Sequence, residues 1–227
     1  MLNPQKTFSF LKQITENNNR AWFADHKSEY KELHGQFTEF MHDIASKIST
    51  FDPGLRKSDT KDATKVFRIY RDARFSRDNK PYKLNLGGQI IPGGRTSPLP
   101  SYYLHIQPGG KSFVGGGLYH PEAKDLSVTR EYIAENYKKL DKLTTDKKFQ
   151  SAFPELWQGE ALKTVPRGYK KDHPAAKYLR LKNYIWSIAL SDKQVLEKDL
   201  QAHILEKFEL LLPVFKYLRK AISTRDQ

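Results

Sequence analysis

The segment YYLHIQPGGKSFVGGGL, residues 102–118, decides the fold class of this 227-residue chain. It contains two runs of β-forming residues, 102–107 and 112–118, with a Pro-Gly-Gly-Lys turn between them. Such runs around a glycine-containing turn are typical of a β-hairpin, whose two strands lie antiparallel. We therefore predict a hairpin in the middle of the fold.

Similar runs extend the sheet on both sides of this hairpin. We expect further strands at residues 65–70, 84–91 and 184–190. The turn Pro92-Gly93-Gly94 separates the second of these from the hairpin. Because no helical pattern separates consecutive strands in the middle of the chain, we predict a mostly antiparallel sheet.

Helical patterns fill the N-terminal fifty residues. Apolar residues recur there at spacings of three and four, which predicts a short first helix and a longer second one. The turn Asn17-Asn18-Asn19 supplies a cap for the second helix, which ends at Asp52-Pro53-Gly54.

The C-terminal half adds three more helices. We expect them at residues 121–143, just after Pro174, and at residues 192–221, where Pro213 would kink or break the last one. The predicted fold class is α+β, in one domain over residues 1–227, with N-terminal helices, a central sheet and a long C-terminal helix.

The composition excludes several classes of protein. The chain has no cysteine, which rules out disulfides, cysteine nucleophiles and cysteine-bound metals. Its residues are 38% hydrophobic and 12% aromatic, which indicates a packed core. The sequence has no run of about 18 apolar residues and no signal-peptide pattern, so we expect a cytoplasmic protein without a membrane partner.

The net charge of +13 is concentrated in two short segments. The first basic segment, KVFRIYRDARFSRDNKPYK at residues 65–83, carries +5. The second basic segment, KTVPRGYKKDHPAAKYLRLK at residues 163–182, carries +6, and the other 188 residues carry only +2. A diffuse excess favours solubility, whereas a focused one indicates an anionic ligand if the two segments meet in space.

The basic residues of the first basic segment recur at every third position. Neither the period of a strand nor that of an α-helix places them all on one surface. We predict a strand that puts Arg68 on the face of Val66 and Tyr70, followed by an irregular loop. Asp72 and Asp78 are expected to form ion pairs with these arginines, and an arginine fixed in this way is preorganised for a phosphate or carboxylate.

Two further features point to a site in the sheet. The glycines Gly115–Gly117 allow either close approach of another strand or backbone amides that face an anion. His105, with Tyr103 nearby, is a candidate for acid–base chemistry, although a single strand histidine is weak evidence. The Gly-Gly-Lys-Ser run at 109–112 lacks the first glycine and the helix of a phosphate-binding loop, so we interpret it as a hairpin turn.

The histidines and carboxylates show no metal-binding spacing. We therefore expect no metal and no cofactor. The oligomeric state does not follow from the sequence.

The run Arg68-Ile-Tyr-Arg71-Asp72-Ala-Arg74-Phe75, followed by Asp78-Asn-Lys-Pro81-Tyr82-Lys83, resembles the R-x-x-R-D-x-R-F signature of a mostly bacterial family, domain of unknown function number 2461. The resemblance covers essentially the whole chain and differs at Asn79, where family members commonly have lysine. Other matching stretches are Asn17–Phe23, Tyr103 with His105, Gly115–Gly117, Arg130, Leu162-Lys163, Pro166–Tyr169, Asp172–Pro174, and Leu179-Arg180 with Lys182. The family implies no activity, but its signature coincides with both basic segments.

Three functions remain open from the sequence. The first is binding of a phosphorylated or carboxylated small molecule in an arginine-rich pocket, with or without enzymatic turnover. The second is a nucleic-acid-binding module, since aromatic residues interleave with the basic ones. The third is a structural or interaction protein whose arginines pair with its own carboxylates.

The candidate site residues fall into two groups. The catalytic candidates are His105, Asp72 and Tyr103. The ligand-binding candidates are Arg68, Arg71, Arg74, Tyr82, Lys83, Gly115, Gly116, Gly117, Arg130, Arg167, Tyr169, Arg180 and Lys182.

Overall fold

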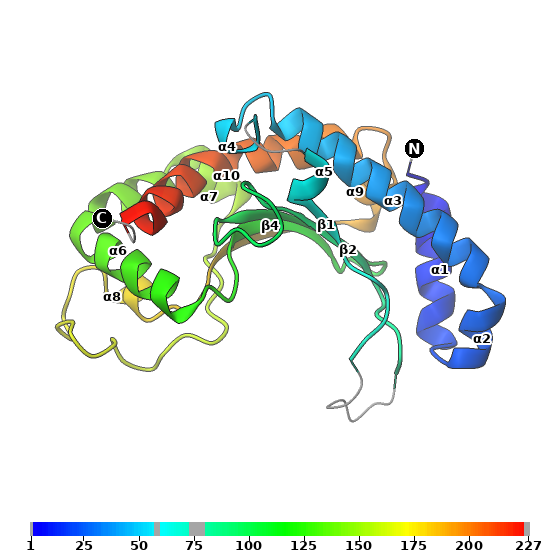
Figure 1. Cartoon of the computed structure of the whole chain (residues 1–227), viewed down its shortest axis with the longest axis horizontal. Coiled ribbons are helices and arrows are strands. Elements are labelled where there is room, and N and C mark those ends of the chain that lie inside the picture. Colours follow the sequence, from blue (N-terminus) through cyan, green and yellow to red (C-terminus); the bar gives the residue numbers. More distant parts are fainter. Residues whose placement is uncertain (1, 57–59, 73–79, 225–227) are drawn as a thin grey trace.

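The computed structural model describes residues 2–56, 60–72 and 80–224 (Figure 1). Its helices are α1 (Pro4–Glu16), α2 (Arg20–Asp25), α3 (Lys27–Ile48), α4 (Pro53–Arg56), α5 (Thr60–Ala63), α6 (Ala123–Thr144), α7 (Lys147–Ala152), α8 (Ala176–Leu179), α9 (Asp192–Leu196) and α10 (Leu200–Ser223). Its strands are β1 (Thr64–Val66), β2 (Leu86–Ile90), β3 (Ser101–Ile106), β4 (Ser112–Leu118) and β5 (Tyr184–Leu190). The predicted α+β class is confirmed.

The five strands form one sheet in the order β1-β2-β3-β4-β5, and every neighbouring pair is antiparallel. The hairpin predicted at residues 102–118 is the β3–β4 pair. The strand predicted at 65–70 is too long, because β1 ends at Val66. Beyond it the chain turns towards α3, where Ile69 is buried and its backbone N–H donates to the Tyr30 hydroxyl at 3.2 Å.

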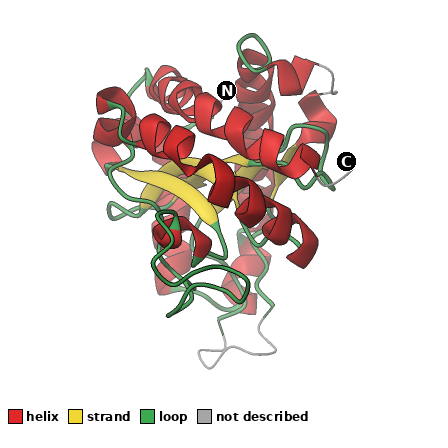
Figure 2. Cartoon of the chain, turned by 90° about the vertical axis from the view of Figure 1, so that its left-hand side faces the viewer, coloured by secondary structure: helices red, strands yellow, loops and turns green. Residues whose placement is uncertain are grey.

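One face of the sheet carries the main core. Inward-facing β3 side chains pack beneath α10, with the Tyr102 ring centroid 4.9 Å from that of Phe208 and 4.6 Å from that of Phe215. The helices α3 and α10 run across this same side of the sheet (Figure 1). Figure 2, turned by 90°, shows helices covering the upper side of the strands. Their apolar stripes, spaced by three and four residues, are what the sheet buries.

A buried ion pair and its hydrogen bonds connect the end of α3, strand β3 and helix α10. Asp52, fully buried after α3, accepts hydrogen bonds at 2.6 Å from both terminal nitrogens of Arg219 on α10. The Tyr102 hydroxyl of β3 donates to the same carboxylate at 2.8 Å, and the Gly54 N–H donates at 2.9 Å. Burial opposes ionisation of Asp52, but these partners outweigh it and lower the pKa of the carboxyl.

Two helices predicted as continuous are each divided. The second N-terminal helix is interrupted at His26, whose backbone leaves helical geometry and whose Nδ1 lies 2.8 Å from the Trp22 carbonyl oxygen. The C-terminal helix is divided between α9 and α10, where Glu197 is extended. In contrast, Pro213 does not break α10: it lies on the exposed side, where the carbonyl of the also exposed Glu209 can meet water.

The other face of the sheet is concave and forms the underside of an arch (Figure 1). One side of the arch consists of α1, α2 and the described residues of the connection between β1 and β2; the other consists of α6, α8 and the loops around residues 155–183. Among the described residues, no helix combines the length and apolar character needed to cross a membrane.

Candidate functional site

A pocket of about 500 Å³ lies on the concave face of the sheet. It is lined by Phe67, Lys83, Asn85, Gln89, Ser101, Tyr103, His105, Phe113, Gly115, Gly116, Tyr119, Trp157, Ile185 and Ser187. Most of these are aromatic, aliphatic or glycine residues, and Lys83 alone among the described lining residues is a lysine, arginine or carboxylate. The pocket therefore presents an apolar surface with one strong positive charge.

The strand register builds the floor of the pocket. Side chains alternate across a strand, so the residues between the core positions of β2 to β5 face the pocket. One row across the sheet runs Gln89, Tyr103, Gly115 and Ser187.

The glycines of β4 are required by the backbone of β5. A Cβ at Gly115 would lie 2.3 Å from the Trp186 carbonyl oxygen, and one at Gly117, where φ is +138°, would lie 1.8 Å from that of Tyr184. The structure thus shows the close approach anticipated from the sequence. Gly115 and Gly116 also line the pocket, so their use towards a ligand stays a prediction.

Tyr103, His105 and Gln107 form a chain of polar groups along β3. His105 Nε2 lies 2.9 Å from the Gln107 side-chain oxygen, and Nδ1 lies 3.4 Å from the Tyr103 hydroxyl. An amide oxygen only accepts, so with this amide orientation Nε2 carries the proton. In the neutral ring Nδ1 is then an acceptor that faces the hydroxyl.

Burial favours the neutral forms of both His105 and Tyr103. It lowers the pKa of His105 below its ordinary 6.5, although the hydrogen bond with Gln107 acts in the opposite direction. Burial, together with the nearby Tyr119, raises the pKa of Tyr103 to about 12. At neutral pH the pair therefore offers a ring nitrogen that accepts a proton and a hydroxyl that donates one.

The end of the pocket nearest β1 is positively charged. The Nζ atoms of Lys65 and Lys83 each lie 5.4 Å from the centroid of the Phe67 ring. Lys83 also donates to the Arg68 carbonyl oxygen at 3.0 Å. Burial and the nearby Arg68 lower the pKa of Lys83, so an approaching anion would favour its charged form.

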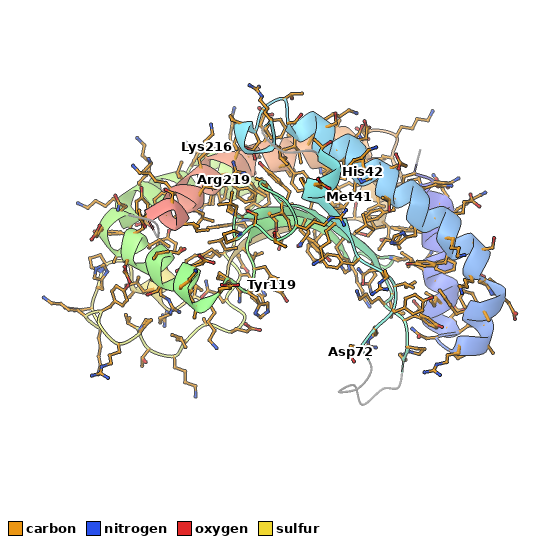
Figure 3. The ribbon with its side chains drawn as sticks, viewed as in Figure 1. Met41, His42, Asp72, Tyr119, Lys216 and Arg219 are labelled. Carbon is orange, nitrogen blue, oxygen red and sulfur yellow. The ribbon has the colours of Figure 1, made fainter. Side chains whose placement is uncertain are left out.

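The opposite end is an aromatic rim, by which we mean Tyr119 and Trp157. These side chains are 65% and 39% exposed, and their ring centroids lie 6.4 Å apart at an angle of 53°. Figure 3 shows Tyr119 beneath the sheet on its concave side.

A family model described as "Conserved hypothetical protein (DUF2461)" matches residues 6–217. The chain belongs to this family. The match includes both basic segments. Searches of curated proteins and of solved structures gave no match. The description of the DUF2461 family names no activity.

Only some residues of the first basic segment lie at the pocket. Lys83 lines the pocket, whereas Arg68 is exposed beside it. Arg71 and Asp72 come farther along the connection, and Asp72 lies on the side of the arch across from Tyr119 (Figure 3). Arg74, with Asp78 and Asn79, lies outside the described residues.

Tyr82 belongs to the packing of the N-terminal helices. Its side chain is 5% exposed, and its ring stacks on that of Phe23 with centroids 4.0 Å apart. The Asn18 side chain forms two hydrogen bonds with the Tyr82 backbone: it donates to the carbonyl oxygen at 3.0 Å and accepts from the N–H at 3.1 Å. This placement gives Tyr82 a role in anchoring the loop that carries Lys83.

The second basic segment stands on the other side of the arch. Arg130 of α6 donates to the Leu181 carbonyl oxygen at 2.8 Å, so this arginine supports the segment from the neighbouring helix. Arg167 and Lys182 are exposed, and Tyr169 and Arg180 are half-buried. None of these described residues lines the pocket.

The two basic segments thus flank the concave face from opposite sides, and only the first reaches the pocket. Among the described residues, no group of three histidines or carboxylates is arranged to hold a metal ion.

Sequence reasoning missed several lining residues. Phe113 and Gln89 could have been found from the sequence, because each alternates with core residues of its strand. No sequence pattern predicts that Tyr119 and Trp157 lie at the pocket, because they come from separate loops that only the folded chain brings together.

Proposed function

We propose that the concave pocket binds a small anionic organic molecule. The observation that carries this proposal is a preformed pocket of about 500 Å³ in which an aromatic surface ends at an ammonium group. Small-molecule sites are commonly clefts of ~300–1,000 Å³, largely apolar with a few polar groups that fix orientation. The ligand's apolar body would lie on Tyr103 and Phe113, with its phosphate or carboxylate at Lys83.

Arginine has a smaller part in this proposal than the sequence suggested. No described arginine lines the pocket, so direct contact with the anion falls to Lys83. Arg68 and the second basic segment flank the concave face and would attract an anion at longer range. Such attraction raises the rate of encounter more than the affinity.

Thermal unfolding with 2-naphthyl phosphate, octyl phosphate and inorganic phosphate tests this proposal. Both organic phosphates should raise the melting temperature by several degrees, since a ligand at 100 times its Kd adds about 2.7 kcal/mol to the free energy of unfolding. Inorganic phosphate should raise it much less, because it lacks the apolar body.

A matched pair of lysine variants locates the charge that matters. Lys83→Gln should weaken binding of both organic phosphates about tenfold or more, whereas Lys216→Gln on the helical side of the molecule should leave it unchanged (Figure 3). Equal stabilisation by inorganic phosphate, or unchanged binding in Lys83→Gln, would contradict the proposal.

A single-stranded nucleic acid is the second candidate. Basic segments on both sides of an aromatic floor are an arrangement that grips phosphates and stacks bases. The affinity of an oligonucleotide should fall steeply with salt, with a logarithmic slope of about 0.7 per phosphate contacted on a single strand. A steep slope for oligonucleotides, with no response to the organic phosphates, would favour this candidate. If neither the organic phosphates nor the oligonucleotides bind, the remaining candidate is a structural or interaction protein.

A further inference from the structure

Tyr119 and Trp157 are large aromatic side chains held at the mouth of the pocket rather than in the core. Both line the pocket, and both are more than one-third exposed. Their ring centroids lie 6.4 Å apart and the rings are tilted by 53°, so the two side chains do not stack on each other. Exposed aromatic side chains at a pocket mouth are suited to contact with a planar ring.

The backbone beside each ring has an unusual conformation. His120 and Glu160, with φ of 47° and 66°, are the non-glycine residues with positive φ in the described chain. His120 directly follows Tyr119, and Glu160 lies three residues after Trp157. Such strained residues concentrate at functional sites, where the surrounding structure enforces them.

A buried asparagine connects the two strained turns. Asn183 is 1% exposed, and its side-chain oxygen accepts a hydrogen bond from the His120 N–H at 2.6 Å. Its amide nitrogen donates to the Glu160 carboxylate at 3.3 Å, and His120 Nε2 lies 3.8 Å from the same carboxylate. One side chain thus fixes both loops at the start of β5.

Gly159 sets the position of the Trp157 ring. A Cβ at this glycine would lie 2.3 Å from Cζ2 of the indole, so the ring lies against a backbone that has no side chain. The backbone of Gly159 does not have positive φ, so alanine is acceptable to the main chain and only the ring must move.

We propose that Tyr119 and Trp157 select ligands with a planar ring, and that Asn183 and Gly159 position the two aromatic side chains for that contact. This inference rests on the proposed function and narrows its ligand class to anions that carry an aromatic or heteroaromatic ring. The ring would lie on the aromatic rim while the anionic group extends across the floor towards Lys83. An aliphatic anion would fill the same pocket without that contact.

Calorimetric titration with 2-naphthyl phosphate and octyl phosphate tests the inference, because the two probes share the phosphate and differ in the planar ring. The wild-type chain should prefer the naphthyl compound by about tenfold. Trp157→Leu and Tyr119→Leu should each remove most of that preference, with little change for octyl phosphate. Trp157→Phe should retain most of it, and Tyr70→Leu, at an exposed tyrosine outside the pocket, should retain all of it.

Gly159→Ala tests positioning without removing an aromatic ring. It should shift the Trp157 contribution to the fluorescence spectrum, obtained by subtracting the spectrum of Trp157→Phe, and reduce the preference for the naphthyl compound. Equal affinity of both probes for the wild-type chain would overturn the selectivity and leave the proposed function standing. Absence of binding by either probe would overturn both proposals.

Discussion

At the residue scale, His105 shows how the environment of a side chain changes its chemistry. Its neighbours are Tyr103, Gln107 and Phe113, whose ring stacks on the imidazole with centroids 4.6 Å apart. Burial among these groups lowers its pKa, so the folded protein holds the neutral ring more firmly than the unfolded chain does. Folding stability therefore depends on pH in a defined direction.

The expected result is a loss of stability in acid that His105 partly causes. Below pH 6.5 the unfolded chain binds more protons than the folded one, so the free energy of unfolding falls as the pH drops through 6.5 towards the lowered pKa. One such site contributes a slope of at most about 1.4 kcal/mol per pH unit. Urea denaturation at several pH values should show a shallower slope for His105→Gln than for the wild type.

His34 provides the comparison for this measurement. Burial lowers its pKa as well, so His34→Gln should remove its own share of the slope, and the double variant should lose both shares. A slope for His105→Gln equal to that of the wild type would show that this histidine titrates alike in both states.

At the element scale, the β4–β5 pair depends on glycine. Seven residues of β4 pair with seven of β5, and the carbonyl oxygens of Trp186 and Tyr184 occupy the space that side chains at Gly115 and Gly117 would need. A strand with ordinary side chains at these positions would hold β5 farther away.

Gly117→Ala should destabilise the fold by roughly 3 kcal/mol or more, because steric overlap and an unfavourable φ act together. Gly35→Ala is the matched control, since this exposed glycine lies inside α3 with open space around it. That change should raise the free energy of unfolding by about 0.5–1 kcal/mol. Urea denaturation measures both, and a loss for Gly117→Ala below about 1 kcal/mol would contradict the close pairing.

At the scale of the whole molecule, Asp52 and Arg219 join distant parts of the chain. The carboxylate lies just after α3, the guanidinium is on α10, and the Tyr102 hydroxyl comes from the sheet that both helices cover. Figure 3 shows Arg219 above the sheet, on the side away from the pocket. This contact therefore supports the convex layer that holds the arch in shape.

Asp52→Asn should cost about 3–5 kcal/mol in the free energy of unfolding, because it leaves the Arg219 charge without its buried partner. Asp43→Asn removes a carboxylate from an exposed pair with Lys47 and should cost less than about 1 kcal/mol. Thermal or urea unfolding compares the two. If both variants unfold alike, the buried pair does not stabilise the fold.

The charge distribution also belongs to this scale. The described parts of the two basic segments stand on opposite sides of the concave face, which carries the pocket. Only the first segment supplies a lining charge, through Lys83. Counting charges along the sequence locates the two basic segments. The sheet that separates them determines which of their residues lie at the pocket.

Most strands and helices follow from local pattern. The strands at 112–118 and 184–190 agree with prediction at both ends, since alternation and turn residues act over a few positions. The strand at 65–70 was overestimated because Ile69 is drawn into a hydrophobic contact with α3, which is distant in sequence. The break at His26 and the intact helix at Pro213 likewise depend on local exposure and side-chain bonding rather than on periodicity.

The sequence by itself determined the antiparallel hairpin, the α+β class and the places where positive charge is concentrated, because these depend on residues close together in the chain. It also pointed to Tyr103, His105, Lys83, Gly115 and Gly116, which line the pocket. The tertiary structure alone decided that no described arginine lines the pocket and that Tyr119 and Trp157 lie together at its mouth. The physical reason is that packing of the sheet against α3 and α10 sets which face is left open and which loops converge beside it.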